Sequence, residues 1–355
     1  MVHDIHEIKG EPAMAYVKRG RKDIPWHTLG TPLPEDATIE EALEISHIGE
    51  RVEKRPVYTA APPRPFETAG GEQIRLDRER AIVRVLDNRV FAVASDQYEI
   101  VQVADAVRPF SGLPFETAGL LGNGSRYWLL ARTSDQIKVA DGDYLDPYVL
   151  VTGGHDARHP VRLMDATTRV VCANTLAVAL RHGGSGLSIK IRHTSNAHDR
   201  LAVAEAQIAA LRARQLTVAE CLRQFGETMA HDKMISDVAE ILFPVGEALT
   251  DRQEENRKAQ RLRFWTALNS SPTVDNSNAY GVFNAVTEYL DWGQTRNGQN
   301  PTSKNADWRE RRALFSLEGA AATQRSAVFK ALSDHAGIDL ATMIASDHHL
   351  QGVSR

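Results

Sequence analysis

The hydrophobic period of this chain switches from strand-like to helical between its middle and its C-terminal part. From residue 51 to about residue 150, short apolar or alternating runs are separated by turn residues, which is typical of antiparallel strands joined by hairpins. Beyond His193 the apolar residues recur at helical spacing, first over Ala197–Arg214 and then over Thr217–Met229. This single switch predicts an α+β protein: an N-terminal antiparallel β-sheet with a central helix, followed by a helical C-terminal half.

The predicted central helix lies within residues 165–194, between the two regions. An apolar segment, Leu176–Leu180, is followed by a glycine-rich break and a basic alternating strand, Ser188–His193. Thr167 or Thr168 would cap the start of the helix, and Gly183 would end it in a left-handed conformation. Polar groups then gather at both ends of a buried element, with cations on both sides. This arrangement favours an anion-binding surface.

The length of 355 residues allows two domains. We expect residues 1–24 to form a flexible basic arm, 25–195 an α+β core, 196–335 a helical region and 336–355 a tail. Near the start of the core, Thr38 and Glu41 have the spacing of a capping box for a helix over Thr38–Ile48.

Charge is unevenly distributed along the chain. The net charge is −4, but residues 158–214 carry nine Lys and Arg against three acids, so that this segment is +6 and the remainder −10. Local positive charge on an acidic protein suits contacts with a nucleic-acid backbone, and a solvated helix face is the competing interpretation. No apolar run is long enough to span a membrane, and two cysteines indicate a reducing compartment, so we expect a cytoplasmic protein.

Catalytic signatures are weak. His155, Asp156 and His159 lie close together in the sequence, but no CxxC or HExxH motif accompanies them. Cys172, with His155 or His193, lies in no recognised cysteine-enzyme motif, and the sequence GxxxxGK[ST] is absent. We therefore expect no catalytic residue, metal or cofactor. A metal- or cysteine-dependent enzyme acting on nucleic acid, and a protein that binds a host factor, are the alternatives.

Nucleic-acid binding is the remaining function, and the basic segment supplies its candidate residues. The guanidinium and ammonium groups would contact phosphates, the neutral polar side chains would fix local geometry, and Tyr127, Trp128 or Tyr148 would stack on bases. The predicted binding residues are Arg169, Asn174, Thr175, Arg181, Lys190, Arg192 and His193.

Four sequence blocks carry a family resemblance: PWHTLG at 25–30, TRVVCANTLA at 168–177, RHT at 192–194 and YGVFNAVTEYLD at 280–291. Together they resemble the phage/plasmid-like proteins of domain-of-unknown-function family 932. The order of elements is also distantly similar to single-strand annealing proteins of the Redβ/RecT type. These resemblances imply a homo-oligomeric protein of a phage, prophage or plasmid that binds single-stranded DNA and promotes strand annealing in recombination without nucleotide hydrolysis.

Overall fold

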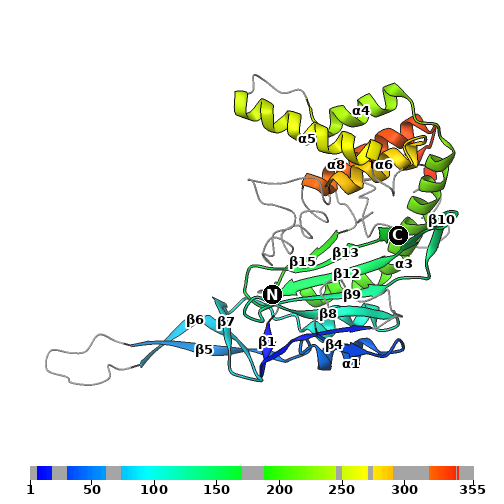
Figure 1. Ribbon diagram of the computed structural model, residues 1–355. Helices are drawn as coiled ribbons and strands as arrows, with labels where there is room; N and C mark the ends of the chain where they lie inside the picture. Colours follow the sequence, from blue (N-terminus) through cyan, green and yellow to red (C-terminus); the bar gives the residue numbers. More distant parts are fainter. Residues whose placement is uncertain are drawn as a thin grey trace.

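The computed structural model describes residues 6–17, 30–60, 73–169, 188–244, 250–270, 275–290, 320–340 and 342–343. A large sheet forms the centre of the molecule, a two-stranded arm projects from one side, and the C-terminal helices stand above the sheet in the view of Figure 1. This architecture confirms the predicted α+β class with a helical C-terminal half.

The central sheet has seven strands in the order β15-β13-β12-β9-β8-β3-β4. Its neighbours pair antiparallel, as predicted, except that β3 and β4 run parallel at one edge. The strands are β3 (Met14–Val17), β4 (Thr31–Leu33), β8 (Phe115–Leu121), β9 (Arg126–Arg132), β12 (Tyr148–Gly154), β13 (Val161–Asp165) and β15 (Ser188–Ile191).

The N-terminal region departs from the prediction. Residues 1–24 were expected to be a flexible arm, but β3 pairs with β8, and Met14, Ala15 and Val17 are fully buried. A short ribbon of β1 (Glu7–Ile8) and β2 (Glu11–Pro12) precedes β3. For residues 6–17 the prediction was wrong because burial here comes from pairing with a strand about a hundred residues away, which no local pattern indicates. Residues 1–5 and 18–24, which include the basic run, lie outside the described residues.

One face of the sheet is covered by helices. These are α1 (Ile39–Ile45), α2 (Val103–Val107), the 3₁₀-helix η1 (Arg108–Phe110) and the first part of α3 (Ala197–Glu227). The predicted capping box of α1 is confirmed, because the Glu41 amide donates to Thr38 Oγ1 at 3.2 Å and the Thr38 amide donates to Glu41 Oε2 at 2.9 Å.

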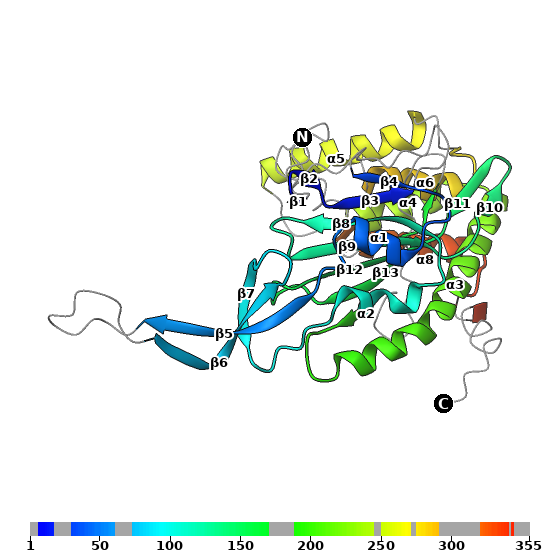
Figure 2. The ribbon, with the colours of Figure 1, turned by 90° about the horizontal axis from the view of Figure 1, so that it is seen from below.

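The arm consists of β5 (Val52–Ala60) and β6 (Gln73–Arg84). Strand β7 (Val90–Ser95) pairs with the C-terminal half of β6, from Glu79 to Val83. Figures 1 and 2 show β5 and β6 extending well beyond the body of the molecule. Among the described residues of the arm, a buried cluster of Val52, Ile82 and Tyr98 lies at its base. The base of the arm is therefore packed against the rest of the molecule.

The helical region has a core of its own, built by the second part of α3 with α4 (Asp232–Leu242), α5 (Asp251–Ser270), α6 (Ala279–Glu288) and α8 (Ala320–His335). Strands β10 (Ile137–Ala140) and β11 (Asp143–Asp146) pack on this core, and the Tyr280 hydroxyl donates to Asp143 Oδ2 at 2.9 Å. Ile338, expected in the tail, is also buried here. Residues after 343 lie outside the described part.

Helix α3 joins the two cores. We predicted two helices with a break near residue 215, but one helix runs from Ala197 to Glu227. Gln215, at the predicted break, is buried, and its amide nitrogen lies within hydrogen-bonding distance of Tyr148 O, Asp165 Oδ1 and Thr167 Oγ1. The predicted domain boundary at residues 195/196 therefore falls at the start of a helix that both cores share.

The predicted central helix is not tested, because residues 170–187 lie outside the described part. The expected cap at Thr167 or Thr168 is wrong, since Thr168 and Arg169 form strand β14, which pairs with β11. In the described residues, every helix is too short or too polar to cross a bilayer.

Candidate nucleic-acid interface

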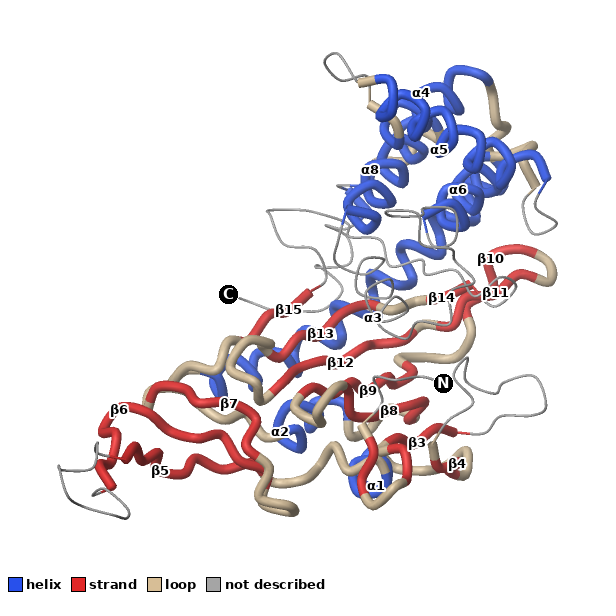
Figure 3. The backbone as a smooth tube through the Cα atoms, turned by 60° about the vertical axis from the view of Figure 1, so that its left-hand side comes forward, coloured by secondary structure: helices blue, strands red, loops and turns tan. Residues whose placement is uncertain are grey.

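The face of the sheet opposite α3 is lined by alternate residues of the strands. On β13, Val161 and Leu163 belong to the core that contains α3, so Arg162 between them points to the other face. On β15, Ile191 is fully buried in the same core, whereas Lys190 is exposed. Figure 3 shows α3 passing behind β12 and β13, so that this second face is the one away from the helix.

Strand register places a line of side chains across this face. Lys190 pairs with Arg162, Arg162 with Thr152, and Thr152 with Trp128. Directly paired residues on neighbouring strands have Cβ atoms about 5 Å apart. Two cations on adjacent strands therefore lie beside each other, with an aromatic ring two strands further along the same line.

Gly119 fixes the position of the Trp128 ring. A Cβ atom built on Gly119 would lie 2.3 Å from the ring of Trp128, its cross-strand partner. The indole therefore rests directly on the backbone of β8, in a space that only glycine leaves open.

Lys190 and Arg192 are the exposed cations of this surface. They flank buried Ile191 on either side in the sequence, so they leave the extended chain on the same face. Within the described part of the chain, neither forms an ion pair with a carboxylate. Their charge is therefore available to a phosphate group. We call Arg162, Lys190, Arg192 and Trp128 the basic row.

The other predicted binding residues are not all brought to this row. Asn174, Thr175 and Arg181 lie outside the described residues, and for Arg169 only the backbone, in β14, is described. His193 turns inward: Nδ1 lies 3.0 Å from Glu99 O and Nε2 lies 3.2 Å from His159 O. Its predicted contact with nucleic acid gains no support from this position.

Sequence reasoning missed the pairing of Arg162 and Trp128 with the predicted cations. Alternation of apolar and polar residues indicates only which residues share one face of a single strand. The order and register of β9, β12, β13 and β15 then determine which of these side chains meet, and alternation within one strand carries no information on register.

The sequence HDARH at 155–159, which contains His155, Asp156 and His159, forms a turn. Asp156 Oδ1 accepts from the amides of Arg158 and His159, both at 3.0 Å, and Oδ2 lies 2.6 Å from His159 Nδ1. Among the described residues, no group of three or more His, Cys, Asp or Glu side chains is placed to hold a metal ion. Cys172 lies outside the described residues, and Cys221 is buried in the helical core.

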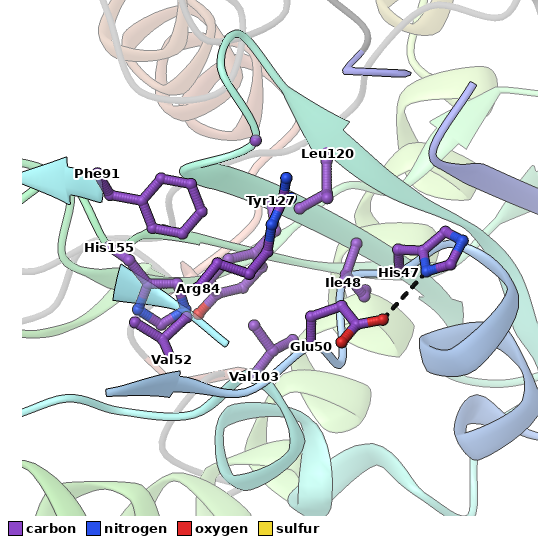
Figure 4. Close-up of a pocket in the computed structure, with 11 residues that line it drawn as sticks. His47, Ile48, Glu50, Val52, Arg84, Phe91, Val103, Leu120, Tyr127 and His155 are labelled. Carbon is purple, nitrogen blue, oxygen red and sulfur yellow. Dashed lines mark hydrogen bonds and ion pairs between the residues drawn. The ribbon is translucent and has the colours of Figure 1, made fainter. Parts of the chain in front are cut away.

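A separate buried cluster surrounds His155 where the base of the arm meets the sheet (Figure 4). The His155 imidazole is almost fully buried, and burial, reinforced by nearby His193, lowers its pKa to about 3. Burial also lowers the pKa of His193 and raises the pKa of the Tyr98 and Tyr127 phenols. All four side chains are therefore neutral near pH 7.

A family model described as Domain of unknown function (DUF932) matches residues 90–314 of the chain. This range contains all four residues of the basic row and most of the central sheet. No curated protein and no solved structure matches the chain.

Proposed function

Because the chain belongs to the DUF932 family, whose description assigns no activity, we propose a function from the geometry: the protein binds single-stranded nucleic acid through its phosphate backbone. The observation that carries the proposal is the basic row. Cations from two adjacent strands and an aromatic ring share one face of the sheet, opposite α3.

Each member of the row has a distinct role in this proposal. Arg162 and Lys190 lie side by side in register, and Arg192 extends the positive charge beyond the end of β15. Phosphate contacts of this kind supply affinity without sequence preference. Trp128, half-buried on the same face, is the candidate for stacking on a base.

The proposal extends to single-stranded DNA as the ligand, to strand annealing during recombination of a mobile element, and to a homo-oligomeric protein. The support for these finer points is the resemblance carried by the four sequence blocks. Backbone binding without base readout is the property that annealing requires, since the bases must remain free to pair.

The test is a double variant, Lys190→Ala with Arg192→Ala, titrated with a fluorescent oligothymidylate at several salt concentrations. Loss of two phosphate contacts should weaken binding and reduce the slope of log K against log salt by about 1.4, at about 0.7 per contact on a single strand. The matched control is Lys233→Ala with Lys330→Ala, which removes the same charge from the exposed surface of α4 and α8.

Unchanged affinity and salt slope in a folded double variant would remove the basic row as the binding surface. An equal loss in the control variant would show that net charge is responsible and that the row has no special role. A third measurement, light scattering with and without the oligonucleotide, tests the oligomer. A monomer that the oligonucleotide leaves unchanged contradicts the annealing proposal.

A further inference from the structure

The outer part of the arm is a ribbon of two strands (Figures 1 and 2). Strand β7 reaches only as far as Glu79 on β6, whereas β5 pairs with β6 out to the Ala60–Gln73 pair. A ribbon of two strands is marginally stable by itself in water, because it needs a further layer on one of its faces. Its large side chains are open to solvent, since Tyr58 is 52% and Ile74 is 49% exposed. The outer arm is therefore suited to contact with another molecule.

Strand register gives the two faces of this ribbon different chemistry. Directly paired residues lie on the same face, so Tyr58 and its partner Arg75 share one face. Pro56, two residues before Tyr58 on β5, and its partner Arg80 lie on that face as well. We call these four residues the cationic face of the arm. The opposite face carries mainly apolar side chains, which are those of Val57, Thr59, Ile74 and Leu76.

The positive charge of the cationic face is not neutralised within the arm. Tyr58 and Arg75 are exposed and form no hydrogen bond or ion pair with another described residue. Arg80 Nη1 donates to two backbone carbonyl oxygens of the adjacent bulge, at 2.9 and 2.8 Å, and these oxygens carry no formal charge. Arg55, by contrast, lies on the opposite face and is paired with Glu53 at 2.6 Å. The uncompensated cations of the outer arm are therefore on the face that carries Tyr58.

This combination of groups matches one nucleotide of an unpaired strand. A guanidinium binds phosphate oxygens through two parallel hydrogen bonds, and an exposed aromatic ring stacks on a base. The Cβ atoms of Tyr58 and Arg75 are about 5 Å apart, because the two residues are direct cross-strand partners. One nucleotide can therefore meet both side chains. In a duplex the faces of the bases are covered by their neighbours, so stacking on Tyr58 favours a single strand.

We propose that the cationic face of the arm is a second binding surface for single-stranded nucleic acid, in which Arg75 and Arg80 contact phosphates and Tyr58 stacks on a base. This inference rests on the proposed function for the class of ligand, but it uses residues separate from the basic row. A strand long enough to reach both surfaces is held by both, and its affinity exceeds that of a strand held by one.

The first test is the double variant Tyr58→Ala with Arg75→Ala, titrated as a full chain with fluorescent oligothymidylates of increasing length. Loss of one stacked base should weaken binding of the longer strands about 5- to 150-fold, and loss of one phosphate contact should reduce their salt slope by about 0.7. The matched control is Thr59→Ala with Ile74→Ala, the adjacent cross-strand pair on the opposite face, which should bind like the unmodified protein. An equal loss in the control overturns the proposal, because the integrity of the ribbon and not its cationic face would then be responsible.

The second test uses the unmodified protein and does not depend on how the variants fold. Photocrosslinking to an oligonucleotide that contains iododeoxyuridine, followed by mass spectrometry, should give an adduct on Tyr58. Adducts on Trp128 without any on Tyr58, together with unchanged affinity of the arm variant, overturn this inference and leave the basic row in place. Weaker binding by the arm variant alone supports the arm and removes the row. An unmodified protein that binds no oligonucleotide contradicts both.

Discussion

Replacing His155 by glutamine should flatten the pH dependence of folding stability on the acid side of neutrality. His155 lies in the turn after β12, where its ring is 4% exposed and faces Phe91, Tyr127 and His193. Burial is the main cause of its low pKa, and the neighbouring imidazole of His193 adds to it. Glutamine keeps a neutral polar side chain at this position and cannot take up the proton.

The magnitude follows from the shift of the pKa. The unfolded chain takes up a proton at His155 near pH 6.5, whereas the folded protein holds the pKa at about 3. The stability associated with the neutral ring is therefore complete above pH 6.5 and is lost as the pH falls toward 3. Each pH unit within this window corresponds to about 1.4 kcal/mol, so the loss between pH 6.5 and about 5 amounts to about 2 kcal/mol.

Urea unfolding at pH 7.5, 6.5 and 5.0, with chloride held constant, measures this loss. The unmodified protein should lose about 2 kcal/mol more than His155→Gln between the two lower pH values, because His6 and His193 contribute equally to both. His198→Gln, on the exposed first turn of α3, is the control and should follow the unmodified protein. If His155→Gln loses as much stability as the unmodified protein, the ring is not held neutral by burial.

Three further substitutions test individual contacts: a helix cap, a contact between a ring and the backbone, and a hydrogen bond between α6 and β11. Thr38→Ala removes the side-chain half of the α1 capping box and should lower the free energy of unfolding by about 1 kcal/mol, measured by urea denaturation. Gly119→Ala places a methyl group against the Trp128 ring and should lower the free energy of unfolding by about 1–3 kcal/mol. It should also shift the tryptophan emission, and unchanged emission would contradict the close contact. Tyr280→Phe removes the hydrogen bond to the buried carboxylate of Asp143 and should lower the free energy of unfolding by about 2 kcal/mol, measured by calorimetry. A loss near zero would show that this hydrogen bond does not couple β11 to α6.

Local signals predicted local structure well. The Thr38–Glu41 pair specified the start of α1 because both members of a capping box lie within four residues, and the structure shows both hydrogen bonds. The change of hydrophobic period near His193 predicted the change from sheet to helices because each period reports one element at a time.

Features that depend on distant contacts escaped the sequence analysis. Gln215 was interpreted as a helix break, yet its amide is satisfied by groups on β12 and near Thr167, so the helix continues through it. The burial of His155 was not predicted, because GGHDARH has the composition of a hairpin tip and the residues that cover the ring come from the base of the arm. Likewise, the cations of the basic row were predicted separately, and strand order brought them together.

The continuity of α3 has a consequence for how this protein tolerates changes in length. Each residue inserted into an α-helix turns the remainder of the helix by about 100° and moves it by about 1.5 Å. An insertion near Gln215 would thus keep Leu201 and Leu211 against the sheet while rotating Cys221 and Phe225 away from their positions in the second core. The number of residues in α3 between the two cores therefore sets the rotation of the helical core relative to the sheet. Viable relatives should therefore vary in loop length but keep this segment free of single-residue insertions and deletions.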